Sequence, residues 1–257
     1  MPSYTIANAA IPTRHLHTYY ALAKSANGIN LIPGTFDLDW IFEVAERDRS
    51  LFPNIKLTGT LDAQSYMVRW VKSYQDAMNR LPSRRRANPK SACTDPAIRV
   101  IVQATQGLTN LQAAQSERSH NLFMSAENIQ GNLLEEYIAY KVRPYGFLWC
   151  AGNVLHATDF CNTTGSFLLQ IKNKSNTENS SSSAIRANTP IQKWYRLGTR
   201  TQGGMKVPVD KWSDLNKIIN DHKTDGYHLP PCAMSEDDYQ AFLFQAASAN
   251  HNLITDV

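Results

Sequence analysis

The chain has 257 residues, of which 42% are hydrophobic and 19% charged, and its formal net charge is +4. This balance excludes an intrinsically disordered protein, which would contain far fewer apolar residues. The longest nearly apolar stretch, GFLWCAG at 146–152, is too short to span a membrane. The length is compatible with one α/β domain, so we expect residues 1–257 to form a single domain.

The N-terminal part of the chain has the pattern of helices. Apolar residues recur at helical spacing in FDLDWIFEVAERD at 36–48 and in LDAQSYMVRWVKSYQDAMNRL at 61–81. The segment at 95–107 opens with Asp-Pro and reaches a glycine, which are residue types that start and end helices. We therefore expect residues 1–120 to form a mainly helical region.

The pattern changes to short strands in the middle of the chain. A helix is predicted over 125–141, with Ser125 as its N-cap. Three runs of strand type follow, at 146–152, 155–160 and 166–174, and the turn-forming residues Asn-Thr-Thr-Gly separate the last two. A short element at 191–197 and helices at 210–220 and 235–249 complete the chain, the last with a Ser235/Asp238 capping box.

Basic residues are concentrated in one part of the sequence. Between Lys172 and Lys217 there are nine lysines and arginines but three acidic residues, and a second basic run, RLPSRRRANPK, lies at 80–90. Clustered positive charge is expected of a protein that binds a polyanion such as nucleic acid. The alternative is an ordinary solvated face with a basic loop.

The predicted strand at 166–174 places an amide and an ammonium on one face. Side chains alternate along a strand, with Phe167, Leu169 and Ile171 on one side and Leu168, Gln170, Lys172 and Lys174 on the other. A buried ammonium would need a charged partner, and Asp159 lies across the turn. We expect Asp159, Gln170 and Lys172 to converge, although an exposed hairpin with ordinary polar residues has the same pattern.

The preceding helix carries two carboxylates at neighbouring positions. Glu135 lies next to Gly131, one turn earlier, where the missing side chain would let another backbone approach. Glu136 lies on the other side of the apolar stripe of this helix. The helical pattern alone does not choose between them, and both could be surface residues.

A helical glutamate, then an aspartate, then a strand with x-x-Lys resembles the PD-(D/E)xK nuclease pattern. A longer string is more specific: AENIQGNLLEEYIA, then DF, LLQIKNKSNTENSSSSAIR and IQKW. It resembles the SinI/AvaII type of type II restriction endonucleases, which cut the sites GGWCC or GGNCC. The resemblance covers about residues 125–200. It implies an α/β fold with a restriction-endonuclease-like mixed sheet flanked by helices, and a catalytic and DNA-recognition core at 121–257.

The resemblance also implies roles in the reaction. Asp159 would bind Mg²⁺, the backbone carbonyl of Ile171 would complete the metal shell, and Glu135 would be a second carboxylate. Lys172 would orient or deprotonate the attacking water, or stabilise the charged transition state. Gln170 stands where the family has an acidic residue, and its neutral amide is a weaker metal ligand.

Double-stranded DNA is the partner that this resemblance implies. The expected DNA contacts are Lys174, Asn176, Asn179, Ser180, Ser181, Ser182, Ser183, Arg186, Lys193, Arg196 and Arg200. Because the site would be nearly palindromic, we expect a homodimer. A restriction enzyme also implies a cognate DNA methyltransferase as its functional counterpart. The cysteines form no CxxC pair and no signal peptide opens the chain, so we expect a cytoplasmic bacterial protein. The alternatives are a non-catalytic nucleic-acid-binding protein and a Mg²⁺-dependent nuclease without a fixed site.

Overall fold

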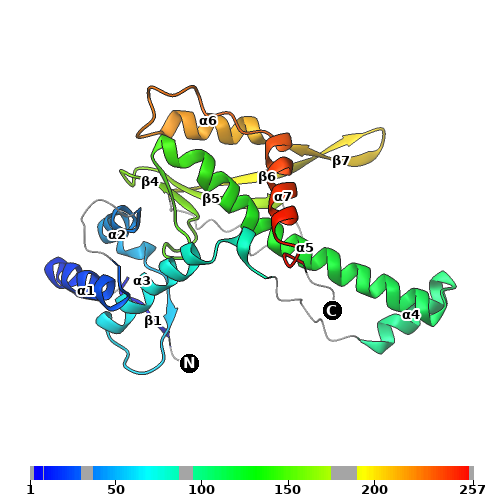
Figure 1. The fold of residues 1–257 in the computed structure, drawn as a ribbon, viewed down its shortest axis with the longest axis horizontal. Coiled ribbons are helices and arrows are strands. Elements are labelled where there is room, and N and C mark those ends of the chain that lie inside the picture. Colours follow the sequence, from blue (N-terminus) through cyan, green and yellow to red (C-terminus); the bar gives the residue numbers. More distant parts are fainter. Residues whose placement is uncertain (1–2, 8, 30–36, 87–94, 175–189, 255–257) are drawn as a thin grey trace. The chain divides into compact units, whose positions relative to one another are not determined.

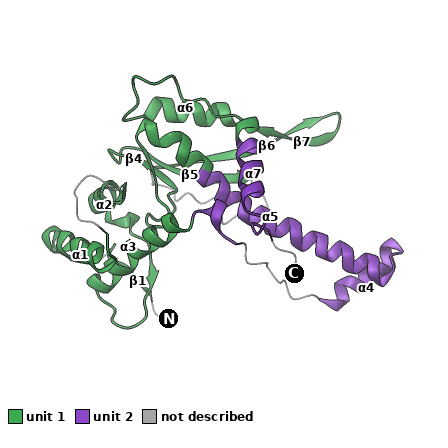
Figure 2. Cartoon of the chain, viewed as in Figure 1, with its two compact units in different colours: residues 1–80, 137–238 green, residues 81–136, 239–257 purple. Residues whose placement is uncertain are grey.

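A computed structural model describes residues 3–7, 9–29, 37–86, 95–174 and 190–254. The described chain divides into two compact units, one made of residues 1–80 and 137–238 and the other of residues 81–136 and 239–257 (Figure 2). The boundary expected near residue 120 falls inside a long helix that contributes to both units. Among the described residues, no helix is both long enough and apolar enough to cross a membrane.

Unit 1 contains a mixed sheet (Figure 1). Among the described residues, five strands pair in the order β3-β4-β5-β6-β7, and of these pairings β5–β6 is parallel. The strands are β3 (Phe147–Trp149), β4 (Phe160–Asn162), β5 (Leu168–Lys174), β6 (Ile191–Gln202) and β7 (Met205–Asp210). Helix α6 (Trp212–His222) follows β7. The predicted mixed α/β sheet with flanking helices is confirmed.

The N-terminal part of unit 1 is mainly helical, as predicted. Its elements are β1 (Ser3–Tyr4), α1 (Thr13–Ala26), α2 (Asp37–Arg47), η1 (Arg49–Leu51), β2 (Ile55–Lys56) and α3 (Ala63–Asn79). The ring of Tyr20 stacks on that of Phe42 at 4.0 Å between centroids, and both rings contact Trp70 edge-on. Trp70 is fully buried, so these aromatic side chains form the core that joins α1, α2 and α3.

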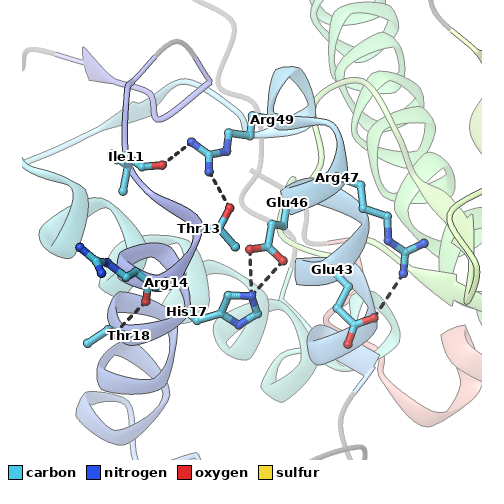
Figure 3. A network of polar contacts seen from close by, with 9 residues as sticks. All are labelled: Ile11, Thr13, Arg14, His17, Thr18, Glu43, Glu46, Arg47 and Arg49. Carbon is cyan, nitrogen blue, oxygen red and sulfur yellow. Dashed lines mark hydrogen bonds and ion pairs between the residues drawn. The ribbon is translucent and has the colours of Figure 1, made fainter.

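Polar contacts hold α1 and the segment before it against α2 and η1 (Figure 3). Arg49 Nη1 donates to the carbonyl of Ile11 at 2.6 Å, and Nη2 donates to Thr13 Oγ1 at 3.3 Å. His17 Nε2 lies 2.8 Å from Glu46 Oε1. These contacts fix the start of α1 against the end of α2.

Unit 2 contains the remaining helices and part of the longest one. Its elements are η2 (Pro82–Arg84), α4 (Pro96–Gln106), α5 (Asn110–Val142) up to residue 136, and α7 (Glu236–Ala249) from residue 239; η3 (Arg143–Tyr145) follows α5 in unit 1. Leu133 of α5 packs with Ala246 of α7 and with Leu253. The Asp95 carboxylate caps α4 by accepting from the Ala97 N–H, and Gly107 ends α4 in the left-handed conformation, as the sequence predicts.

Three sequence-based boundaries are wrong. Helix α5 begins at Asn110, so Ser125 lies inside it and does not cap it. Residues 155–160 do not form a strand, since β4 begins at Phe160. The short element expected at 191–197 is a strand of 12 residues that turns back into β7.

Candidate active site at the β4–β5 hairpin

Asp159 lies directly before β4 and is held through its backbone on both sides. Its N–H donates to the carbonyl of Leu169 on β5 at 2.9 Å. Its own carbonyl accepts from the N–H of Cys150, next to β3, also at 2.9 Å. The backbone of this residue is therefore built into the sheet, and its side chain has a fixed origin.

The carboxylate of Asp159 reaches across to β5. Its Oδ2 accepts a hydrogen bond from the backbone N–H of Ile171 at 2.6 Å. Burial raises the pKa of this carboxyl above its usual range, while the Ile171 hydrogen bond and the nearby Lys172 ammonium oppose the rise. The structure thus brings together Asp159, the Ile171 backbone and the charge of Lys172.

Gln170 and Lys172 occupy the same face of β5, and both are half-buried. Alternate residues Leu169 and Ile171 are buried on the other face. On β6, Lys193 is the register partner of Gln170, and Tyr195 is the partner of Lys172. A half-buried face next to the half-buried Asp159 carboxylate explains how the strand carries an amide and an ammonium side by side.

Replacing Asp159 with asparagine is expected to raise the melting temperature (Tm) at neutral pH. The pKa of the Asp159 carboxyl is higher in the folded than in the unfolded state. The carboxyl therefore lowers the free energy of unfolding as pH rises from about 4 through the folded pKa. The amide of the Asp159→Asn variant would keep an oxygen for the Ile171 N–H without the buried charge. We expect a rise of about 2–4 °C for each 1 kcal/mol of relief.

Thermal unfolding of wild type and Asp159→Asn across pH checks this. The difference in Tm should be present at pH 7. It should vanish below about pH 4, where the Asp159 carboxyl is protonated in both the folded and the unfolded state. A variant that melts below the wild type at pH 7 would show that the carboxylate stabilises the fold.

The loop between β3 and β4 is fastened by the N-terminal helices. Trp70 Nε1 of α3 donates to the carbonyl of Val154 at 2.7 Å, and the His156 N–H donates to the carbonyl of Leu51 at 2.7 Å. Asn153 has a positive φ of 56°, which non-glycine residues rarely adopt. These anchors fix the segment that ends at Asp159, and sequence reasoning missed them because no local pattern links them.

Helix α2 holds the other end of the hairpin. Arg47 Nη1 donates to the carbonyl of Thr164 in the β4–β5 turn at 2.6 Å. Gly165, with φ of 69°, approaches so closely that an added Cβ would lie 2.9 Å from Val44 Cγ2. The turn predicted at this place is therefore packed against α2.

The two helical glutamates belong to unit 2 and differ in their surroundings. Glu136 is 1% exposed, and its two oxygens accept from the N–H of Ser83 at 2.7 Å and from the Ser83 hydroxyl at 2.6 Å. Glu135 is half-buried. Glu136 is thus a structural residue that ties α5 to η2.

The oxygen donors around Asp159 are of the kind that can hold magnesium. Within the described part of the chain, no group of three or more His, Cys, Asp or Glu side chains is placed to hold a metal ion. Mg²⁺ usually binds through one or two carboxylates together with waters and substrate phosphates, so such a group is not required. A carboxylate beside an amide side chain and a strand backbone offers oxygen ligands of the kind that Mg²⁺ prefers, and the residues present fit this ion.

Arg196, one of the expected DNA contacts, is buried and already has partners within the protein. It is 6% exposed, its Nε donates to Asn173 Oδ1 at 2.8 Å, and its Nη1 is paired with Glu236 Oε1 at 2.5 Å. Trp212 Nε1 donates to the second oxygen of Glu236 at 2.8 Å. A buried arginine held in this way braces β5 against β6.

The other predicted DNA contacts divide into two groups. Lys193 is half-buried on β6, and Arg200 is exposed farther along the same strand. Lys174 ends β5, but its side chain lies outside the described part. Outside the described residues lie Asn176, Asn179, Ser180, Ser181, Ser182, Ser183 and Arg186.

Comparison with known proteins gives the same family by two routes. The sequence model of the family described as SinI restriction endonuclease matches residues 58–224, a range that includes Asp159 and Lys172. The chain is 32% identical over 169 residues to the type II restriction enzyme SinI of Salmonella infantis, an alignment that covers 64% of this chain and 66% of that enzyme. It is 35% identical over 192 residues to the type II restriction enzyme Eco47I of Escherichia coli, covering 73% and 75% of the two chains. The chain therefore belongs to the SinI restriction endonuclease family.

Proposed function

We propose that the protein hydrolyses phosphodiester bonds in both strands of double-stranded DNA, at one short site and with Mg²⁺ as cofactor. The observation that carries this proposal is the Asp159 carboxylate bonded to the Ile171 N–H, on the strand that presents Lys172. This hairpin lies within the stretch that matches the family. A site of the GGWCC or GGNCC kind follows from the resemblance.

Lys172 provides the positive charge of the proposed reaction. It lies on the half-buried face of β5, close enough to Asp159 to oppose the rise in its pKa. An ammonium at this place orients the attacking water or stabilises the negative charge that develops on the phosphate. Gln170, on the same face, orients polar groups of the substrate as a neutral donor and acceptor.

Asp159 and the Ile171 carbonyl would hold the magnesium ion, with Glu135 as a second carboxylate. The bound ion supplies Lewis-acid stabilisation of phosphate oxygens and a water of lowered pKa. The chain itself contributes the rigid origin of the Asp159 carboxylate and the braced β5–β6 pair. We further propose a homodimer, in which each subunit cuts one strand, and a cognate DNA methyltransferase in the same bacterial cytoplasm.

The two helical glutamates should respond differently to mutation. Glu136→Ala leaves the Ser83 N–H and hydroxyl without their acceptor, so we expect a loss of about 1–3 kcal/mol in unfolding free energy and unchanged chemistry per folded molecule. Glu135→Ala should slow DNA cleavage. Thermal unfolding and single-turnover cleavage measure the two effects, and the reverse order would move the catalytic carboxylate to Glu136.

Supercoiled plasmid incubated with the protein in Mg²⁺ and in EDTA tests the proposed function. We expect a fixed set of discrete linear fragments in Mg²⁺ and intact plasmid in EDTA. Retention of the DNA on native gels in EDTA with no breaks in Mg²⁺ would favour the alternative of a non-catalytic DNA-binding protein. A smear of fragments of all lengths would instead favour a nuclease without a fixed site.

A further inference from the structure

Strands β6 and β7 extend beyond the sheet as a two-stranded ribbon (Figure 1). The described pairing of β6 with β5 ends at Leu197, whereas its pairing with β7 continues to Gln202, opposite Met205. Side chains from Thr199 to Lys206 are exposed. An isolated two-stranded ribbon is marginally stable and buries little, so its side chains are available to a ligand.

One face of this ribbon continues the face that presents Lys172. Lys172 is the register partner of Tyr195, and alternate residues on β6 after Tyr195 are Leu197, Thr199 and Thr201. Lys206 is the register partner of Thr201, so it lies on the same face. We call the three exposed residues Thr199, Thr201 and Lys206 the ribbon face. Arg200 lies on the opposite face with its register partner Val207.

The opposite face of the sheet is covered by protein. Trp194 and Arg196 are buried there, and Trp194 Nε1 donates to the carbonyl of Lys211 at 3.0 Å. A long ligand that reaches Lys172 must therefore approach from the side of the ribbon face. Two hydroxyls and an ammonium on that face are donors suited to phosphates and to base edges. The nearest acidic residue on the ribbon, Asp210, lies at its base, opposite Leu197.

We propose that the β6–β7 ribbon enters a groove of the DNA with its ribbon face against the duplex and contributes to sequence recognition. The inference rests on the proposed function, because it needs the scissile phosphate at Lys172. At about 3.4 Å per residue, Thr199 and Thr201 lie roughly 14 and 20 Å along β6 from Tyr195. A DNA strand rises about 3.4 Å per nucleotide, so these distances correspond to about four and six base pairs. The ribbon face would therefore contact base pairs no farther than about six from the break. The major groove is wide enough to admit a two-stranded ribbon.

Three single variants test this with matched losses. Thr201→Val removes a hydroxyl and Lys206→Ala removes a cation from the ribbon face, whereas the control Lys72→Ala removes an exposed cation from α3, outside the ribbon. Each protein digests a library of randomised duplexes in Mg²⁺, and the fragment ends are sequenced. All three positions are exposed, and a Tm within error of the wild type shows that the fold is kept.

We expect Thr201→Val and Lys206→Ala to lower discrimination roughly tenfold to a hundredfold at one or two positions within six base pairs of the break. Lys72→Ala should keep the wild-type preference. Unchanged preferences in both ribbon-face variants, or an equal loss of preference in Lys72→Ala, would overturn the inference. A wild-type enzyme that still cuts one site would in that case uphold the proposed function. A wild-type protein that cuts no fixed site would overturn both.

Discussion

Replacing Lys172 with alanine is expected to abolish DNA cleavage while leaving binding to the preferred site measurable. Lys172 is half-buried beside the Asp159 carboxylate, so its ammonium acts at the place where the phosphate would gain negative charge. Loss of one such electrostatic contact lowers the rate by roughly 10²–10³ or more. Single-turnover cleavage in Mg²⁺ and a binding titration in EDTA measure the two properties separately.

Lys217→Ala is the matched control. Its ammonium is 75% exposed on α6 and pairs with Asp221 one turn later, so the variant loses the same charge at a place outside the proposed site. We expect wild-type cleavage from this control. If Lys172→Ala also cuts at a near wild-type rate, the assignment of the β4–β5 hairpin as the active site is wrong.

Replacing Trp70 with alanine is expected to cause the largest loss of stability among single changes in the N-terminal helices. The indole is 0% exposed, contacts the rings of Tyr20, Phe42 and Phe52, and donates to the carbonyl of Val154. Such truncations cost about 3–5 kcal/mol, which corresponds to a fall in Tm of roughly 6–20 °C. Cleavage should fall as well, because the anchored loop leads directly to Asp159.

Trp70→Phe separates the two contributions. It keeps most of the ring packing but leaves the Val154 carbonyl without its donor, for which we expect a loss of about 1–3 kcal/mol. Trp40→Ala, at an indole that is 39% exposed on α2, should change Tm much less. A Trp70→Ala protein that melts and cuts like the wild type would show that the N-terminal helices do not support the hairpin.

The β4–β5 hairpin could be predicted because its information is local. Alternation in SFLLQIK fixes which side chains share a face, and Asn-Thr-Thr-Gly marks the turn. The strand expected at 155–160 failed because distant partners decide its backbone. The segment there forms hydrogen bonds to Trp70 and Leu51 instead of a strand, and Asn153 and Ala157 adopt left-handed conformations. No local sequence pattern predicts these contacts.

Two other errors had readable signals. Helix α5 starts after a reciprocal cap in which the Thr109 N–H donates to Gln112 Oε1 at 2.9 Å and the Gln112 N–H donates to Thr109 Oγ1 at 3.3 Å. Ser125, the predicted N-cap, instead lies inside α5, where the residue is buried. The Gly203-Gly204 pair between β6 and β7 is a typical hairpin turn, and it predicts the ribbon once it is read together with the flanking alternation.

The two arginines of β6 illustrate what sequence alone leaves undecided. Arg196 and Arg200 are four residues apart in one basic stretch, and both are plausible guanine readers by type. Arg196 lies where β6 is covered by protein, and it pairs with Glu236, 40 residues later in the chain. Arg200 lies beyond Leu197, the last residue of β6 that pairs with β5 in the described part of the chain. Which arginine is buried depends on tertiary packing, and alternation along the strand does not reveal it.

Mapping the DNA ends that the protein produces tests whether the β4–β5 hairpin cuts DNA at one fixed site. A sequenced plasmid is digested with the wild type and with Lys172→Ala in Mg²⁺, and the ends of all fragments are sequenced. Wild-type ends should fall at one short, near-palindromic sequence of the GGWCC or GGNCC kind, and Lys172→Ala should yield no ends above background. Ends scattered without a common sequence, or the same ends from Lys172→Ala, would contradict a site-specific nuclease that acts through Lys172.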